Sequence, residues 1–292
     1  MVGIHVEVDW VVGRTSGRGL DDGRSVLGRA ERFLEAEDDS GEDRAARRAF
    51  TPTSDGRHRL NEKLGVVHRV NRTHWVMPSK ETHWPLFGLR VRTPRLELRY
   101  PDDDDGVALA ELAARGIHDP DWMPFAITWT DVESPQLERN SLQHYWLLRA
   151  QWTADNWHLP MAVVVDGAIV GTQAVAAENF AQTRVAHTGS WLGRAHQGQG
   201  IGKEMRAAIV HLVFAGLGAD IADSGAWHDN GPSLGVSRSL GYEENGEDIV
   251  MRRDVADRQI RLRLTRERWE RQRRTDIEIE GLDPCRAMFG AV

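Results

Sequence analysis

Gln197-Gly198-Gln199-Gly200-Ile201-Gly202-Lys203 is the stretch that decides how this chain is interpreted. It lies between a predicted strand and a segment, residues 201–217, whose apolar side chains recur at helical spacing. Glycines let the backbone approach a ligand closely, and the first-turn amides of a helix, together with the positive end of its dipole, bind phosphate oxygens. We therefore expect this loop to bind an anion such as a pyrophosphate. A flexible turn without a ligand is the alternative.

The spacing of the glycines separates three kinds of phosphate-binding loop. A Walker A motif fails at Gln197, where it needs Gly, and at Glu204, where it needs Ser or Thr. The dinucleotide fingerprint fails because neither register of the glycines places a third Gly where that motif needs one. The pattern Gln/Arg-x-x-Gly-x-Gly/Ala is met, by Gln197, Gly200 and Gly202.

The segments around this loop predict an α/β fold. Alternating apolar and polar residues predict strands, an Asp166-Gly167 pair predicts a tight hairpin turn, and a run of acids at 102–105 predicts a helix start. Strands come first and a strand-helix-strand order follows, which indicates a mixed sheet with helices on both faces. The predicted strands are 96–100, 161–165, 168–176, 183–192, 219–226 and one after Tyr242, and the predicted helices are 102–112, 135–152, 201–217 and 232–240.

Three motifs in the expected order resemble the GNAT superfamily of acyltransferases. The loop at 197–203 resembles its coenzyme A pyrophosphate loop. Asn230-Gly231-Pro232-Ser233, followed by Leu240-Gly241-Tyr242, resembles elements of the RimJ/RimL branch, as does the opening from Leu89 to Arg99. Shorter matches, such as 118–121, 189–193 and 283–286, resemble a sub-branch of succinyl-CoA transferases. The resemblance implies the GNAT fold, with a mostly antiparallel central sheet.

The same resemblance implies which residues hold the acyl-CoA. The loop residues Gln197, Gly198, Gln199, Gly200, Ile201, Gly202 and Lys203 would bind the pyrophosphate. Asn230 would hydrogen-bond the pantetheine arm, and a backbone N–H of Trp191, Leu192 or Gly193 would stabilise the oxyanion of the tetrahedral intermediate. Ser233 would protonate the departing thiolate. Helix caps are the alternative roles of Asn230 and Ser233, and a helix surface is the alternative for Lys203.

A base or a water chain must remove a proton from the acceptor amine, because an alkyl amine with a pKa near 10 is about 0.1% neutral at pH 7. Asp131 and Glu133 are candidates, as is Asp121, because they lie in the loop that borders the acceptor pocket in this family. His187, on the strand before the phosphate loop, is another candidate. Each has a structural alternative, a helix start for the carboxylates and a packed strand residue for His187.

A succinyl donor would also need a cation to meet its free carboxylate, preferably an arginine. His118 and Arg149 are the candidates that the sequence offers. The tryptophans at 122, 129, 146, 152 and 157 can line an acceptor pocket, although large aromatics at helical spacing more often belong to the core.

Composition restricts the partners. A formal net charge of -7 and a pI near 6.0 argue against general nucleic-acid binding. Cys285 is the only cysteine, so neither an intramolecular disulfide nor a Cys-rich metal site is expected, and no metal is predicted. Without a signal peptide or an apolar run of membrane-spanning length, the chain is predicted to be soluble and cytoplasmic.

Three regions differ in character. Residues 1–82 are rich in Gly, Arg, Asp and Glu and are predicted to be a poorly ordered extension, or an artefact of an upstream start, since Met77 could begin a complete domain. Residues 83–264 form the predicted acyltransferase domain. Residues 265–292, with several large apolar side chains, are expected to pack on the domain or to form a subunit contact in a homo-oligomer.

The prediction is thus an N-acyltransferase that moves an acetyl or succinyl group from coenzyme A to a primary amine by direct attack. The acceptor is a small molecule or a protein N-terminus or lysine. The alternative from another class is a catalytically silent acyl-CoA-binding sensor or interaction module.

Overall fold

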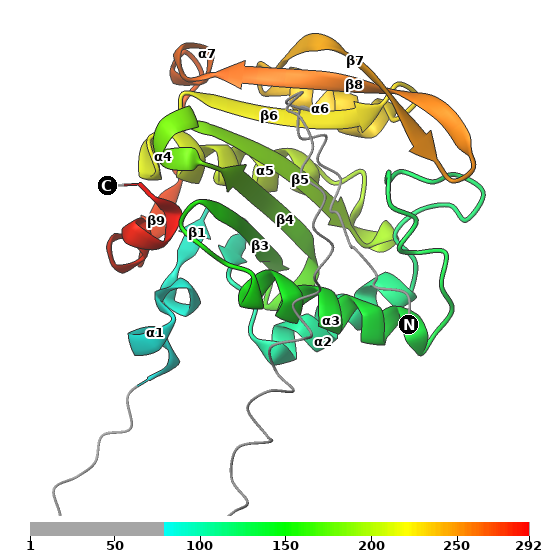
Figure 1. Cartoon of the computed structure of the whole chain (residues 1–292), viewed down its shortest axis with the longest axis horizontal. Coiled ribbons are helices and arrows are strands. Elements are labelled where there is room, and N and C mark those ends of the chain that lie inside the picture. The colour runs from blue at the N-terminus through cyan, green and yellow to red at the C-terminus, as the bar shows by residue number, and fades with distance from the viewer. Residues whose placement is uncertain (1–78, 292) are drawn as a thin grey trace, which may run out of the picture. The chain divides into compact units, whose positions relative to one another are not determined.

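A computed structural model describes residues 79–291, and within that range the chain forms one nine-stranded sheet in the order β7-β8-β6-β5-β4-β3-β2-β1-β9 (Figure 1). Neighbouring strands are antiparallel except for β5 and β6, so the mixed, mostly antiparallel sheet is confirmed. The strands are β1 (Arg90–Arg92), β2 (Glu97–Arg99), β3 (Asn156–Val165), β4 (Ala168–Glu178), β5 (Val185–Leu192), β6 (Ile221–Trp227), β7 (Glu243–Arg252), β8 (Val255–Thr265) and β9 (Glu278–Glu280).

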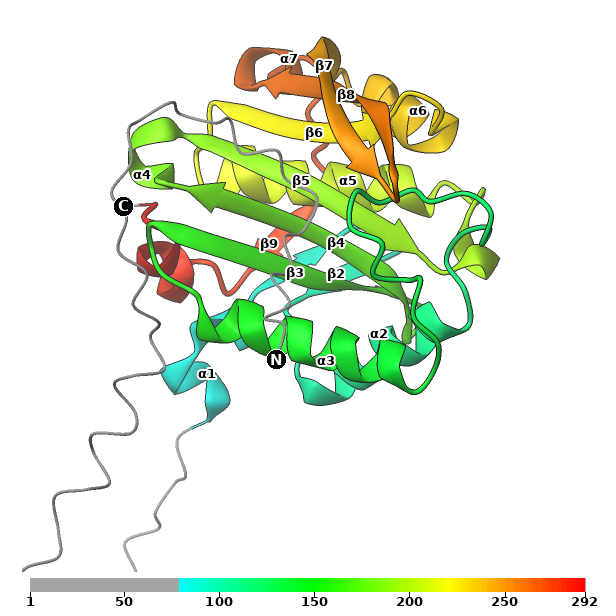
Figure 2. The same ribbon diagram turned by 45° about the vertical axis from the view of Figure 1, so that its right-hand side comes forward.

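Helices cover both faces of the sheet (Figures 1 and 2). The pair α2 and α3 packs on one face against β3 and β4, whereas α5 packs on the other face against β4 and β5 and contacts α6. The helices are α1 (Lys80–His83), α2 (Asp103–Ala114), α3 (Gln136–Ala150), α4 (Phe180–Thr183), α5 (Ile201–His211), α6 (Gly231–Ser239) and α7 (Arg266–Glu270), with 3-10 segments at Pro85–Gly88, Arg194–His196 and Asp283–Phe289.

The predicted elements are present, with differences at some ends. The Asp166-Gly167 turn joins β3 to β4 with φ angles of 50° and 80°, as a tight hairpin requires. The acids at the start of α2 include its N-cap, Asp102, whose side chain accepts a hydrogen bond from the Asp105 N–H. The helix predicted over 201–217 changes to one π-helical turn, Leu212–Gly216, after His211.

Strands β5 and β6 pair over a short length and then diverge. The parallel register joins Val185 to Ile221, Ala186 to Ala222 and His187 to Asp223. Beyond His187 strand β5 continues to Leu192 paired with β4, and β6 continues to Trp227 paired with β8. The C-terminal half of β5 therefore has an edge turned toward β6 without a ladder on that side.

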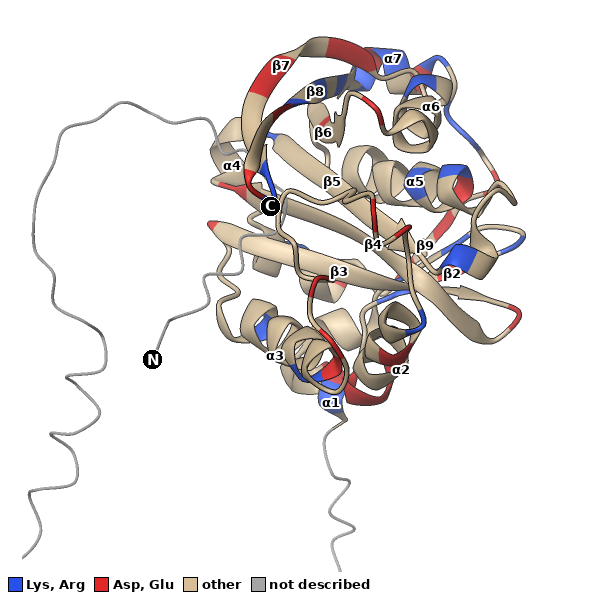
Figure 3. Cartoon of the chain, turned by 90° about the vertical axis from the view of Figure 1, so that its right-hand side faces the viewer, with Lys and Arg blue, Asp and Glu red and all other residues tan. Residues whose placement is uncertain are grey.

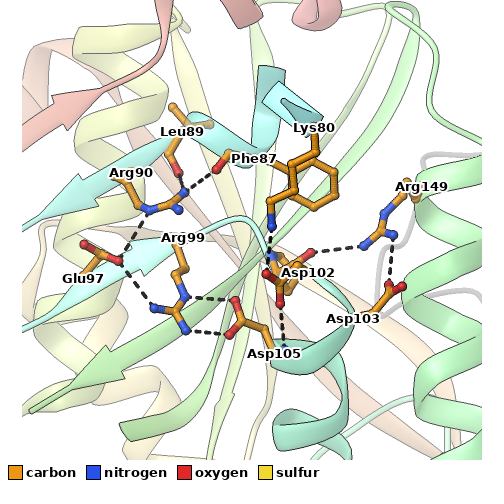
Figure 4. Close-up of polar contacts among 11 residues, drawn as sticks. Lys80, Phe87, Leu89, Arg90, Glu97, Arg99, Asp102, Asp103, Asp105 and Arg149 are labelled. Carbon is orange, nitrogen blue, oxygen red and sulfur yellow. Dashed lines mark hydrogen bonds and ion pairs between the residues drawn. The ribbon is translucent and has the colours of Figure 1, made fainter. Parts of the chain in front are cut away.

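Ion pairs join the first elements of the domain to one another (Figure 4). Arg99 on β2 makes a two-pronged pair with Asp105 on α2, with its Nη2 atom 2.6 Å from Oδ1. Arg149 on α3 contacts Asp103 at 3.1 Å, and Lys80 on α1 contacts Asp102 at 2.9 Å. The charges at the start of α2 therefore tie three neighbouring elements to this helix.

The segment after β8 packs on the domain. Strand β9 pairs with β1 at the edge of the sheet, and Trp269, Ile277 and Phe289 are buried in the main core. Beside this segment, the acidic residues of β7 face the arginines of β8 (Figure 3), as in the pair of Arg261 with Asp248. The extension predicted over residues 1–82 lies outside the described residues up to residue 78, and residues 80–83 form α1.

Candidate functional site

The loop at 197–203 ends at the exposed start of α5. Gly198 and Gly200 have φ angles of 72° and 78°, and Gly200 is the N-cap residue, with no side chain capping the helix. A Cβ at Gly198 would meet nothing within 4 Å, so the backbone there is open to approach. The first-turn N–H groups, from Ile201 onward, are therefore available to an anion.

Side chains of the loop hold its shape. The Nε2 atom of Gln197 donates to the carbonyls of Ile117 and Leu192 at 2.8 and 2.9 Å, so this side chain ties the loop to β5 and to the turn after α2. Gln199 donates to the Ala195 carbonyl at 2.7 Å. Both glutamines were predicted to bind the cofactor. In the structure their amides fix the loop, and its backbone faces outward.

Two cations stand near the loop. Arg95, which sequence reasoning did not select, lies with its Nη2 atom 3.6 Å from a Cβ built at Gly200, and it pairs with the buried Glu204 at 2.6 Å. Lys203 is exposed on the first turn of α5 and borders a hollow of about 240 Å³ between α5, α6 and the C-terminal segment. Positive charge near the loop would favour phosphates.

The free edge of β5 carries backbone donors. Gly193 N–H donates to the Val170 carbonyl at 3.0 Å, toward β4, so the alternation of an antiparallel strand turns the N–H groups of Ser190 and Leu192 toward β6. Of the three donors predicted for the oxyanion, Gly193 is thus occupied, Trp191 faces β4 and Leu192 faces the gap. Ser190 is a further donor that the sequence motif did not indicate.

The start of α6 lies beyond the end of β6. Asn230 is the N-cap of α6, and its Oδ1 atom accepts a hydrogen bond from the Ser233 N–H at 3.1 Å. Asn230 therefore has the helix-cap role that was predicted as its alternative. The same alternative is wrong for Ser233, because Ser233 is the third residue of α6 and donates its N–H to the cap. The Ser233 side chain is half-buried.

The candidate bases differ in their surroundings. Asp131 makes a two-pronged ion pair with Arg253, both contacts 2.9 Å long, and this pairing lowers the pKa of the carboxyl. Glu133 is exposed. Burial lowers the pKa of His187 despite the opposing charge of Asp223, its partner across the β5–β6 ladder. His187 is therefore neutral at pH 7 and can accept a proton.

The five candidate tryptophans lie in three different settings. Trp157 is buried in the core, and Trp152 packs on that core. Trp129 lies 6.0 Å from Trp191 between ring centroids, on the sheet face opposite α5, and Trp122 donates to Asp229 just before α6. Trp146 is 48% exposed. Only Trp122 and Trp129 are therefore placed near β5 and α6.

The two cations suggested for a donor carboxylate are both engaged away from the β5–β6 gap. Arg149 pairs with Asp103 on α2, and the ring nitrogens of His118 bond to the Asp119 carbonyl and the Thr130 hydroxyl. The structure instead brings Arg206 of α5 beneath the gap, buried against polar side chains of β4, β5 and β6. Sequence reasoning missed Arg206, although it is a charge beside the apolar stripe of α5.

A glycine-rich loop at an uncapped helix start thus lies beside a strand whose edge is free. The family described as "Acetyltransferase (GNAT) domain" matches residues 95–243. Because this match covers more than half of the chain, the chain belongs to the GNAT acetyltransferase family.

Several solved structures are similar to this chain at low identity. Mycobacterium smegmatis RimJ in complex with CoA-disulfide is 19% identical, with a TM-score of 0.50, over 63% of this chain and 90% of that one. The ribosomal-protein-S5-alanine acetyltransferase from Vibrio fischeri is 18% identical, with a TM-score of 0.49, over 62% and 98% of the two chains. An acetyltransferase (GNAT family) from Bacillus anthracis is 15% identical, with a TM-score of 0.49, over 61% and 99%.

Among residues 79–291, no helix combines the length and the apolar character needed to cross a membrane. Nor do three or more His, Cys, Asp or Glu side chains in the described range come together in a way that could hold a metal ion.

Proposed function

We propose that this protein is an acyl-CoA-dependent N-acyltransferase that moves an acetyl or succinyl group onto a primary amine by direct attack. One observation carries the proposal: the uncapped start of α5, preceded by Gly198 and Gly200 with positive φ, lies next to the free edge of β5. The first feature suits a pyrophosphate. The second offers backbone partners to an extended amide-containing arm.

We assign each step of the proposed reaction to particular groups of this chain. The amine nitrogen bonds to the thioester carbonyl carbon, the C–S bond breaks, the nitrogen loses a proton and the thiolate gains one. The N–H groups of Ser190 and Leu192 would stabilise the developing oxyanion, a contribution of roughly 3 to 4 kcal/mol per donor in other acyl-transfer sites. Asn230 would bind the pantetheine arm with its remaining polar atoms, and Ser233 would donate a proton to the thiolate.

We assign the removal of the amine proton to His187 in preference to Asp131 and Glu133. A neutral imidazole accepts a proton, and burial keeps His187 neutral near pH 7. Asp131 is held as a carboxylate by Arg253, which weakens it as a base. His187 also shares a sheet face with Trp191, because residues two apart on a strand face the same way and 187, 189 and 191 form such a series.

Calorimetric titration of the full chain with coenzyme A, acetyl-CoA and succinyl-CoA tests the cofactor site. Gly200→Glu would place an anion at the start of α5, and we expect it to weaken binding at least 10-fold. Gly167→Glu is the matched control, because Gly167 has nearly the same φ, 80° against 78°, and open space around a Cβ, but lies in the β3–β4 turn. Equal binding by the two variants would refute the loop site.

Turnover with a panel of amines then tests the reaction. We expect acyl-amine product and free thiol in equal amounts with the native protein. Binding of acyl-CoA without any product across small amines, peptide N-termini and lysine peptides would contradict transferase activity and leave a binding module.

A further inference from the structure

A hollow of about 240 Å³ lies between α5, the end of α6 and the segment that follows α7, and no step of the proposed reaction uses it. Packing and hydrogen bonds hold its walls in place. The ring of Trp269 stacks on Phe214 with 5.1 Å between the ring centroids, and the side chain of Gln272 donates to the Leu240 carbonyl. Because these groups are fixed, the hollow is a preformed feature of the fold, as small-molecule sites usually are.

Two cations line the hollow, whereas none of the described residues that line it is an Asp or a Glu. Lys203 has no ion pair within residues 79–291, so its charge is not neutralised there. Arg274 donates with Nε and Nη2 to Asp276 at 2.8 and 2.7 Å, which leaves its Nη1 donors for another acceptor. Glu204 lies 3.9 Å from Arg274 but is held by Arg95 at 2.6 Å. The lining is therefore positively charged and attracts an anion.

His211 adds an unsatisfied polar group to the same wall. It is 6% exposed, and its Nδ1 atom is buried without a hydrogen-bond partner in the described part of the chain. Burial lowers the pKa of His211, and the charge of Arg273 lowers it further, so the imidazole is neutral at pH 7. Buried polar groups normally have partners, and a neutral imidazole both donates and accepts. An occupant with a polar oxygen atom would supply the missing partner.

The rest of the lining is mostly apolar and limits the size of the occupant. Val210, Leu240, Trp269 and Ile277 contribute hydrophobic surface. An apolar cavity of about 150 Å³ holds one benzene molecule in another protein. A hollow of about 240 Å³ thus has room for one aromatic ring and a carboxylate. Apolar walls with a few polar groups that fix orientation are the usual composition of a small-molecule site.

We propose that the hollow is a second ligand site, which binds a small carboxylic acid whose apolar body has about the size of one aromatic ring. The carboxylate pairs with Lys203 and Arg274, and the body packs on Trp269 and Ile277. Of the loop at 197–203, only Lys203 lines the hollow, so the acid and coenzyme A bind at the same time. The site does not depend on the proposed function, because its lining residues lie outside β5 and β6.

Calorimetry of the full-length protein with benzoate, benzamide and inorganic phosphate tests the site. Benzamide has nearly the shape of benzoate without its charge, and phosphate has charge without an apolar body. We expect saturable binding of benzoate, about 10-fold or more tighter than that of either control, because an ionised acceptor strengthens hydrogen bonds to cations. Absence of saturable benzoate binding, or equal binding of benzoate and a control, would overturn the inference.

Repeating the benzoate titration with saturating coenzyme A separates the hollow from the coenzyme loop. We expect the Kd for benzoate to stay within about threefold, because only Lys203 is shared between the two regions. Loss of benzoate binding would show that the coenzyme fills the hollow and would overturn a second site. Should coenzyme A itself not bind, the proposed function fails, and the titrations without it still decide the second site.

Variants then locate the bound acid. Gln272→Glu places a carboxylate at the wall of the hollow with little change of shape, and it should weaken benzoate about 10-fold or more. Gln143→Glu is the matched control, because Gln143 is an exposed glutamine on α3, across the sheet from α5, and benzoate should bind it as it binds the native protein. Benzoate binding of native strength in Gln272→Glu would refute the location. Lys203→Gln, at an exposed position, should weaken benzoate but not benzamide, and it decides the location if Gln272→Glu does not fold.

Discussion

At the scale of single residues, the site depends on which polar groups are already committed to partners. The side chains of Gln197 and Asn230 stabilise the fold. Gln197 donates hydrogen bonds to two carbonyls, and Asn230 caps α6. Asp131 is committed to Arg253. We assign chemistry to His187, whose imidazole burial keeps neutral, and to Ser233, whose hydroxyl is half-buried. Arg206 is buried and donates to side chains of three strands.

Ser233 allows a prediction that separates catalysis from folding. Ser233→Ala should lower kcat by about 10- to 100-fold, because the departing thiolate loses its proton donor. The Kd for coenzyme A and the free energy of unfolding should change little, since Asn230 provides the cap of α6. Steady-state kinetics, calorimetry and urea unfolding measure the three quantities. Ser239→Ala, an exposed serine at the other end of the same helix, is the control, and an unchanged kcat in Ser233→Ala would exclude the assigned role.

The sequence predicted the phosphate loop because glycine spacing reports backbone conformation directly, and Gly198 and Gly200 do have positive φ. It could not predict Arg206. A charge beside the stripe of an amphipathic helix looks like a surface residue, and only the packing of α5 under three strands buries it. Nor could spacing show that Gln197 serves the loop, because its acceptors Ile117 and Leu192 come from separate elements.

At the scale of elements, local patterns predicted the long helices and six of the nine strands, but not β1, β8 and β9, and they failed where tertiary context sets the backbone. Helix α4 is a single turn between Asn179 and Arg184, two non-glycine residues with positive φ, and nothing in its composition marks it. The π-helical turn after His211 continues an apolar pattern that an α-helix would show equally. The hairpin at Asp166-Gly167 was predictable because this turn requires its residue types.

The packing of α3 on β3 buries two histidines and predicts acid sensitivity. Burial lowers the pKa of His144 to about 4 and that of His158 to about 3, below the usual 6.5. Between these values and pH 6.5 the unfolded chain binds more protons than the folded one, so stability is full above pH 6.5 and falls as the pH drops below it. From pH 7 to pH 5.5 the two histidines should together lower the free energy of unfolding by about 2 to 3 kcal/mol.

Urea unfolding followed by tryptophan fluorescence at a series of pH values measures this effect. The double variant His144→Gln, His158→Gln should show a much flatter decline between pH 7 and pH 5.5, whatever its stability at neutral pH. His83→Gln removes an exposed histidine and should decline as the native protein does. A double variant with the native pH slope would show that other groups cause the decline.

At the scale of the whole molecule, the order of the strands makes the site. The chain places β5 in the interior of the sheet, parallel to β6, and divergence of these strands opens the gap above Arg206. The order follows from long-range pairing, which local periodicity does not report. The order of the predicted elements indicated a mixed sheet with helices on both faces, and the family resemblance implied the GNAT arrangement of its strands. The pairing of β9 with β1, which closes the far edge, had no local signal.

The C-terminal segment should belong to the cooperative core. Phe289 is fully buried, with its ring centroid 4.9 Å from that of Trp157 and 5.4 Å from that of Trp152. Phe289→Ala should therefore lower the free energy of unfolding by about 3 to 5 kcal/mol, because the lost apolar contacts leave a cavity that packed tryptophans cannot fill. Asp283→Ala, in the same segment but with a side chain 90% exposed, should cost less than about 1 kcal/mol even though it pairs with Arg286. Urea unfolding of both variants measures the difference, and a single transition is expected in each. A loss below 1 kcal/mol in Phe289→Ala, or a separate early transition, would mean that the segment is an appendage whose packing the rest of the domain does not need.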